Sequence, residues 1–148
     1  MSAVELATPV LLTGPDVWMG ETAQSSDDWV HQFSDADIAE IDAAYRHAVD
    51  AGASLATLTR DLFPLPTVGP VLVRLQHELE EGWGLFLLRG IPVERYSKDD
   101  LRLIYWGIGL HLGTAVSQSK RGDVLGDVRD LGTGLDGPAF RGYTSAGE

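Results

Sequence analysis

A short apolar run between two glycines is the feature that most constrains the fold. Four consecutive apolar residues, Leu85–Leu88, lie between Gly84 and Gly90, with one arginine before the second glycine. Because this run is too short for a helix and is bounded by turn-forming residues, it predicts a buried strand. A second short strand is expected over residues 123–131, where valines alternate with glycine.

Three amphipathic helices are predicted around the first strand, over residues 34–52, 67–82 and 97–113. The first and third begin with a Ser-x-x-Asp pair, which is typical of a capping box, and Thr67 is expected to cap the second. A glycine ends each helix. At helical spacing, the apolar stripes are Ile38, Ile41, Tyr45, Ala48 and Val49, then Val68, Val71, Leu72, Leu75 and Leu79, and finally Leu101, Ile104, Tyr105, Ile108 and Leu112.

The predicted fold class is therefore α+β, in one domain. The chain has 148 residues, of which 44% are hydrophobic, and this is enough for a real core. We expect an irregular N-terminal segment over residues 1–33, whose Trp18 and Trp29 must pack on the remainder. The main domain is expected over residues 34–148.

Charge and cysteine content exclude several classes of function. The net charge is −11, and residues 1–56 hold ten carboxylates against one base, Arg46, so nucleic acid is not an expected partner. The chain has no cysteine, which removes disulfides, thiolate metal sites and cysteine nucleophiles. No leader or bilayer-spanning segment is recognisable, so we expect a cytoplasmic protein without a membrane partner.

The histidines do not form a recognisable metal motif. They are His31, His47, His77 and His111, and none is followed two positions later by Asp or Glu. A metal could be held between His77 and Glu81, which are one helical turn apart, but a solvated helix face is favoured. His111 is expected to be a buried or half-buried packing residue.

Two further patterns have a functional and a structural interpretation. The glycines of Gly107–Gly113 resemble a dinucleotide-binding loop, but they follow a helix start and have the spacing GxGxxxG. Close packing at the end of a helix is therefore favoured over nucleotide binding. Likewise, Asp123, Asp127 and Asp130 lack the rhythm of a calcium loop and are interpreted as turn carboxylates.

Four segments in the second half of the chain carry a family resemblance. They are residues 82–92 (GWGLFLLRGIP), 112–118 (LGTAVSQ), 122–130 (GDVLGDVRD) and 141–146 (RGYTSA). In order and spacing they resemble the taurine dioxygenase (TauD/TfdA) family, whose early strand typically ends in Arg-Gly-Phe/Ile-Pro. The resemblance covers residues 34–148.

This resemblance implies a distorted double-stranded β-helix, related to the jelly roll, with helices packed on one side. It also implies Fe(II) held by two histidines and one carboxylate, with 2-oxoglutarate and O₂ in the open positions. Such an enzyme hydroxylates an unactivated C–H bond of a small organic substrate. In the family, the first two iron ligands form a His-x-Asp/Glu pair, and this chain has none.

We therefore expect an N-terminal part of a dioxygenase, inactive alone and without a cofactor of its own. In the subgroup that the chain resembles, the missing pair follows the segment where this chain stops, at Glu148. By analogy, Ser117, Gln118, Tyr143 and Glu148 are candidates for the wall of the substrate pocket, although hydrogen bonding within turns is the simpler role for them. Arg89 and Arg141 are expected to pair with local carboxylates such as Asp127 or Asp130. The alternative is a non-catalytic acidic α+β interaction module.

Overall fold

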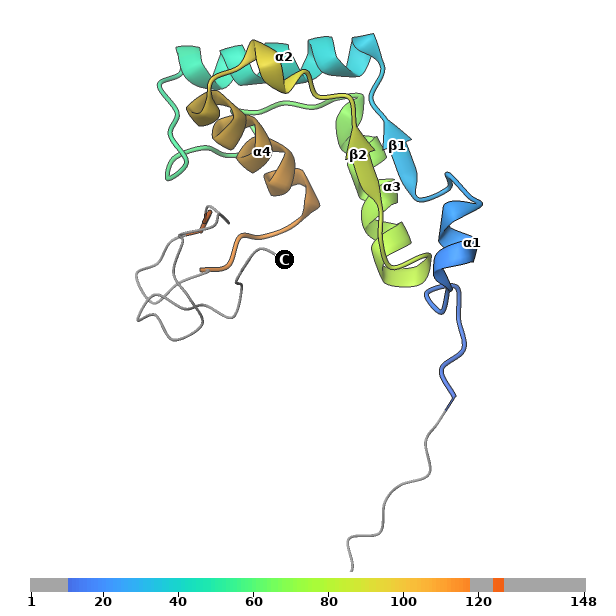
Figure 1. Ribbon diagram of the computed structural model, residues 1–148. Coiled ribbons are helices and arrows are strands. Elements are labelled where there is room, and N and C mark those ends of the chain that lie inside the picture. Colours follow the sequence, from blue (N-terminus) through green and yellow to red (C-terminus); the bar gives the residue numbers. More distant parts are fainter. Residues whose placement is uncertain (1–10, 118–123, 127–148) are drawn as a thin grey trace, which may run out of the picture. The chain divides into compact units, whose positions relative to one another are not determined.

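The computed structural model describes residues 11–117 and 124–126. By internal contacts the chain divides into two units, Met1–Thr114 and Ala115–Glu148. The helices and strands described below all lie in the first unit (Figure 1). Most of the strand predicted over residues 123–131 lies outside the described residues, and the domain boundary between residues 33 and 34 stays a prediction.

Helices dominate the first unit, with a small parallel sheet beside them, which agrees with the predicted α+β class. The long helices are close to the predicted ranges, and α1 and β1 lie in a segment expected to be irregular. In chain order the elements are α1 (Gly20–Gln24), β1 (Val30–Gln32), α2 (Asp35–Asp50), α3 (Val68–Glu81), β2 (Leu87–Arg89), the 3₁₀ turn η1 (Val93–Arg95) and α4 (Lys98–Leu112). Among the described residues, no helix combines the length and apolarity needed to cross a bilayer.

Helices α2 and α4 begin with the predicted capping boxes. In α2, the Ser34 hydroxyl accepts from the Asp37 amide at 3.2 Å, and the Asp37 carboxylate accepts from the Ser34 amide at 2.8 Å. In α4, Ser97 and Asp100 make the same pair of bonds, at 3.2 and 3.0 Å. Each box satisfies amide groups that the first helical turn leaves without partners.

Helix α3 begins in a way that the sequence did not reveal. The Thr67 side chain makes no capping hydrogen bond, so this prediction was wrong. Instead, the Glu40 carboxylate of α2 accepts from the amides of Thr67 and Val68, at 2.9 and 2.8 Å. A carboxylate at a helix N-terminus satisfies free amides and also interacts favourably with the helix dipole. Gly82 ends the helix as predicted.

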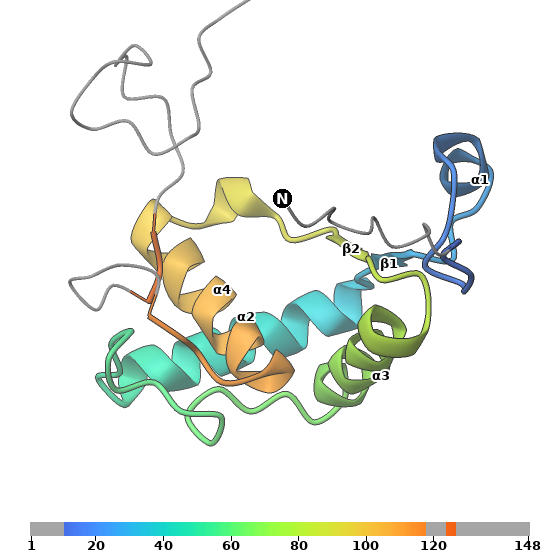
Figure 2. The ribbon, with the colours of Figure 1, turned by 90° about the horizontal axis from the view of Figure 1, so that it is seen from below.

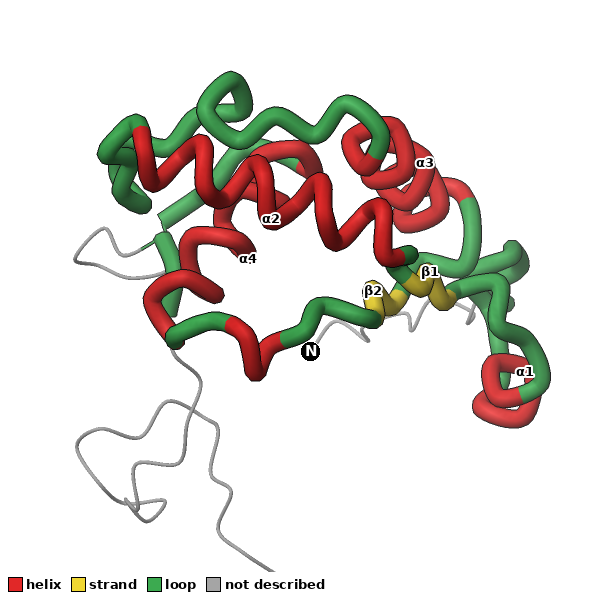
Figure 3. Tube along the Cα trace, turned by 90° about the horizontal axis from the view of Figure 1, so that it is seen from above, coloured by secondary structure: helices red, strands yellow, loops and turns green. Residues whose placement is uncertain are grey.

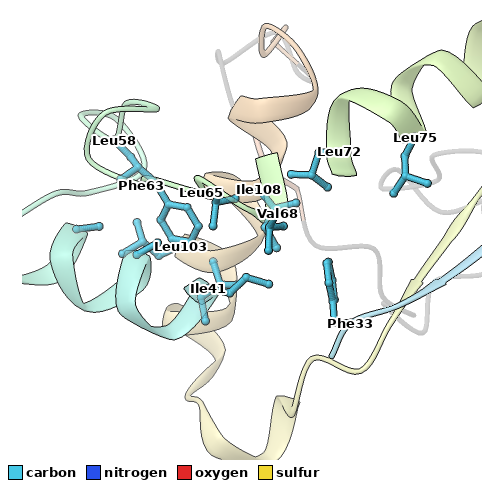
Figure 4. Close-up of a cluster of buried hydrophobic side chains, with 13 residues drawn as sticks. Phe33, Ile41, Leu58, Phe63, Leu65, Val68, Leu72, Leu75, Leu103 and Ile108 are labelled. Atoms are coloured by element: carbon cyan, nitrogen blue, oxygen red, sulfur yellow. The ribbon is translucent and has the colours of Figure 1, made fainter. Parts of the chain in front are cut away.

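The apolar core lies where α2, α3 and α4 meet (Figure 2). Phe63, from the segment between α2 and α3, is fully buried among side chains of the helices (Figure 4). The other core residues are Phe33, Ile41, Ala44, Ala48, Leu58, Leu65, Val68, Leu72, Leu75, Leu103, Ile104 and Ile108.

Three residues of the predicted apolar stripes are exposed. Val49, Leu79 and Tyr105 are 47%, 43% and 67% exposed, respectively. Val49 and Tyr105 lie at the margins of their stripes, and neighbouring helices cover only one sector of a helix surface. Leu79 lies within its stripe but near the C-terminal end of α3. Helical spacing therefore identified the buried face and overestimated its width in α2 and α4.

The strands β1 and β2 pair in parallel, with Val30 opposite Leu87 (Figure 3). The Leu87 amide donates to the carbonyl of Trp29 at 2.7 Å, and the Phe33 amide donates to the carbonyl of Arg89 at 2.9 Å. The apolar run predicted a buried strand, but neither strand contains a buried residue, and β2 is limited to Leu87–Arg89. The strand prediction was thus correct in place and wrong in extent and burial.

One face of the apolar run reaches the helical core. Phe86 and Leu88 are partly buried and pack against the core cluster, which includes Leu72 and Leu75 of α3. Alternation along an extended chain brings these two side chains to the same face. These two residues therefore attach the apolar run to the helical core.

The two tryptophans of the N-terminal segment each donate a hydrogen bond from the indole N–H group. The Trp18 indole donates to the carbonyl of Trp83 at 2.9 Å, which joins this segment to the residues just after α3. The Trp29 indole donates to the carbonyl of Ala23 at 2.9 Å, within the segment itself. Trp18 is 38% exposed and Trp29 is half-buried, and neither packs against the core cluster, so the expected packing role is filled by backbone hydrogen bonds.

Candidate functional site

Of the four residues predicted to line the substrate pocket, the structure describes only Ser117. Ser117 follows α4 and is exposed. Gln118, Tyr143 and Glu148 lie outside the described residues, as do the predicted partners of Arg89 and the carboxylates assigned to turns, Asp123, Asp127 and Asp130. Their role therefore stays a prediction.

The histidines are dispersed over different elements of the first unit. His31 is in β1, His47 in α2, His77 in α3 and His111 in α4, and His77 is exposed. Within residues 11–117 and 124–126, no group of three His, Asp or Glu side chains could hold a metal ion. The described residues therefore do not fit an Fe(II) site, which needs three ligands on one face.

The glycine-rich end of α4 is a close packing site. A Cβ atom on Gly107 would lie 2.5 Å from the ring of Phe63, so only glycine leaves room for this ring. Beside it, Nε2 of the half-buried His111 lies 2.8 Å from the carbonyl oxygen of Phe63. Because Gly107 and Gly109 are inside α4 and do not precede a helix, the structure supports the packing interpretation of this motif.

A polar cluster joins α2 to the start of α4. The Tyr45 hydroxyl donates to Oδ1 of Asp100 at 2.6 Å, and the Tyr96 hydroxyl donates to Oδ1 of Asp42 at 3.3 Å. Arg46 pairs with Asp42 at 2.6 Å. The rings of Tyr45 and Tyr96 meet edge to face, with centroids 5.8 Å apart. Sequence analysis missed this cluster because its partners are 54 and 55 residues apart.

The cluster changes the protonation behaviour of its members. The hydrogen bond to Asp100 is the main cause that raises the pKa of Tyr45 to about 12, with burial second. The bond from Tyr45 and then those from Ser97 lower the pKa of Asp100. For Tyr96, burial is the main cause of a raised pKa, followed by the charge of Asp42. These shifts favour neutral phenols that donate to ionised carboxylates. The cluster therefore connects α2 to the start of α4 through hydrogen bonds.

Two buried nitrogen atoms have no hydrogen-bond partner within the described part of the chain. They are Nε2 of His31 and Nε of Arg102. The His31 ring instead contacts Phe33 edge to face, with centroids 5.4 Å apart. An aromatic contact explains the position of the His31 ring, but it does not satisfy its buried nitrogen.

Comparison with known proteins gives two relatives with informative names. FR-33289 synthase of Streptomyces rubellomurinus is 33% identical over 133 residues, which cover 89% of this chain and 39% of the synthase. A taurine hydroxylase-like protein of Stachybotrys chartarum is 30% identical over 120 residues, which cover 80% of this chain and 31% of that protein. No family model matches the chain.

These similarities point to a taurine dioxygenase-like relationship. The name of the Stachybotrys relative agrees with the family resemblance of residues 34–148, and both relatives align with most of this chain. The chain spans less than two fifths of either relative's length, at 39% and 31%. The activity of a whole relative is therefore not assigned to this chain by similarity alone.

Proposed function

We propose that the chain is the N-terminal portion of a non-haem Fe(II)/2-oxoglutarate dioxygenase that hydroxylates a small organic molecule. The observation that carries this proposal is the 30% identity to a taurine hydroxylase-like protein over 80% of this chain. Hydroxylation is also the reaction that the resemblance of the Arg89-Gly90-Ile91-Pro92 segment implies. The substrate itself is not specified by the described residues.

In this proposal, the helices are a scaffold beside a larger sheet. The strands β1 and β2 are three residues long, each with two half-buried residues and one exposed residue, and isolated two-stranded sheets are marginally stable. Phe86 and Leu88 attach the apolar run to the helical core. A jelly-roll sheet extending from β2 would give this run a second covered face, which is the environment that four consecutive apolar residues favour.

Fe(II) and 2-oxoglutarate are assigned to the whole dioxygenase and not to this chain alone. The described residues offer no group of three His, Asp or Glu side chains that could hold the iron. Ser117, Gln118, Tyr143 and Glu148 keep their proposed role as part of the substrate-pocket wall. On this basis, the chain alone is expected to be inactive.

The encoding DNA provides the most direct test. In one of the three forward frames after Glu148, the family resemblance leads us to expect a His-x-Asp or His-x-Glu pair within about ten codons. The two ligands of such a pair are separated by one residue, so on a strand both side chains lie on the same face and can reach the same metal. A second histidine and a basic residue should follow further on. If all three frames lack the pair, the dioxygenase proposal is wrong, and the interaction-module alternative replaces it.

A turnover assay tests the inactivity of the chain. The purified protein is incubated with Fe(II), 2-oxoglutarate, ascorbate and a panel of small organic acids, and succinate is measured. We expect no succinate above a metal-free control, since Fe(II) without a facial ligand set binds weakly. Metal-dependent succinate formation would show that this chain alone can assemble a working iron site, and would contradict the proposed inactivity.

A further inference from the structure

The carboxylate of Asp100 makes hydrogen bonds in two directions. Its Oδ2 atom accepts from the amide and the hydroxyl of Ser97, at 3.0 and 2.7 Å, which fixes the first turn of α4. Its Oδ1 atom accepts from the Tyr45 hydroxyl of α2 at 2.6 Å. One ionisable group therefore both caps α4 and connects that cap to a neighbouring helix.

The other capping box of the chain provides an internal reference. The Asp37 carboxylate accepts from the amide and hydroxyl of Ser34, both at 2.8 Å and both through Oδ2. Among the described residues, no tyrosine bonds to Asp37, so this box is local to α2. The two boxes share the same Ser-x-x-Asp chemistry and differ in the bond from Tyr45.

We propose that Asp100 is an acid-sensitive latch, and that protonation of this one carboxylate frees the first turn of α4 from α2 while the apolar core stays packed. A protonated carboxyl group is a weaker acceptor, and its added proton meets donors from Ser97 and Tyr45. The bonds in both directions therefore weaken together. Ile104 and Ile108, further along α4, are buried in the core and hold the rest of the helix.

The charged and titratable neighbours are consistent with a latch that is closed at neutral pH. Asp42 and Arg46 face the cluster from α2 as an ion pair, and Tyr96 bonds to Asp42 from the segment before α4. Arg95, next to Tyr96, lowers the pKa of that phenol by its charge, as Arg46 does. These groups form a second tyrosine–carboxylate tie beside the first.

The pKa directions set the pH range of the latch. Hydrogen bonds from Tyr45 and Ser97 lower the pKa of Asp100 from 3.8, so its contribution is complete above this value and is lost as the pH falls through the lowered pKa. The pKa of Tyr45 is raised from 10.0 to about 12, so its contribution is complete below pH 10 and is lost as the pH rises through about 12. The latch therefore opens in acid and again in strong base.

A comparison of Tyr45→Phe with the wild type and with Tyr105→Phe tests the latch. Tyr105 is in α4, whereas Tyr45 is in α2, and it is 67% exposed, so its replacement is a matched loss of one hydroxyl. Carboxylate titrations by NMR should show the pKa of Asp100 rising toward its ordinary value in Tyr45→Phe, with that of Asp37 unchanged. The Leu101 amide should exchange about three- to tenfold faster, with Ile41 unchanged. Tyr105→Phe should change neither quantity.

Two outcomes would overturn the proposal. One is an unchanged pKa of Asp100 in Tyr45→Phe, and the other is equal acceleration of the Leu101 and Ile41 amides, which indicates general loss of stability.

If Tyr45→Phe does not fold, Asp100→Asn takes its place. After correction for intrinsic exchange, wild-type Leu101 should lose protection relative to Ile41 as the pH falls below 3.8, and Asp100→Asn should not. The same pH dependence in both proteins would also reject the latch.

Discussion

The helical part of the first unit and its two-stranded sheet differ in how deeply their side chains are buried. Phe63, Leu72 and Val68 are fully buried where α2, α3 and α4 meet, whereas every residue of β1 and β2 is half-buried or exposed. The helices also begin with satisfied amides, through two capping boxes and the Glu40 carboxylate. The helical part therefore has its own core, and the strand pair depends on the edge of that core through residues such as Phe86.

This difference predicts where stability is concentrated. Burial of apolar side chains supplies the main favourable free energy of folding, so substitutions at the helical junction should have larger effects than those in the apolar run of β2. Polar ties between helices should contribute less than either, because each replaces bonds that the groups would make with water. The three predictions below test this order.

The largest loss is expected for Phe63→Ala. Phe63 is completely buried and fits against Gly107, so its removal leaves a cavity that the surrounding helices can fill only in part. The free energy of unfolding should fall by about 3–5 kcal/mol, measured by urea unfolding. The exposed Val73, replaced in Val73→Ala, is the control and should change it by less than about 0.5 kcal/mol.

A double-mutant cycle with Gly107→Ala localises this effect. In the wild type, the added methyl group meets the Phe63 ring and should cost about 1–3 kcal/mol. In the Phe63→Ala background the space is open, and the same change should be neutral or favourable because alanine is a better helix former than glycine. Equal effects of Gly107→Ala in both backgrounds would contradict the packing of Phe63 on this glycine.

The sequence was most informative where structure depends on near neighbours. Both Ser-x-x-Asp boxes and the ranges of α2, α3 and α4 were predicted, because capping and helical periodicity act within a few residues. The cap from Glu40 to α3 spans 27 residues, and the bond from Tyr45 to Asp100 spans 55, so neither leaves a local pattern. Phe63 lies in a loop, where no periodicity marks a buried residue.

The candidate site was less predictable than the fold. Its residues were taken from a resemblance, and of these only Ser117 lies within the described residues. The packing role of the Gly107–Gly113 motif could be predicted, because a phosphate-binding loop must precede a helix and this motif ends one. The order of elements, however, does not specify which side chains a substrate would meet.

A smaller loss is expected for Phe86→Ala, at the edge of the core. Phe86 is half-buried, so truncation removes part of the contact area that a core phenylalanine provides. The free energy of unfolding should fall by about 2 kcal/mol, which is less than for Phe63→Ala. Val93→Ala, at a position that is 58% exposed, is the control and should have almost no effect.

The relative size of these two losses tests the comparison. If Phe86→Ala is as destabilising as Phe63→Ala, the apolar run belongs to the core as fully as the helices do. If Phe86→Ala leaves the free energy of unfolding unchanged, the packing of Phe86 on the core cluster is wrong. Either result would reject the division into a self-sufficient helical part and a dependent strand pair.

The smallest loss is expected for Glu40→Ala, which removes the carboxylate that caps α3 from α2. Thr67 is exposed at the start of α3, so water can replace part of what Glu40 provides there. The free energy of unfolding should fall by about 1 kcal/mol, as for the loss of a side-chain N-cap. Glu40→Gln keeps an acceptor oxygen and should lose less, whereas Glu94→Ala, an exposed glutamate in η1, should lose almost nothing. Equal losses for Glu40→Ala and Glu94→Ala would show that the Glu40 carboxylate does not cap α3 in solution.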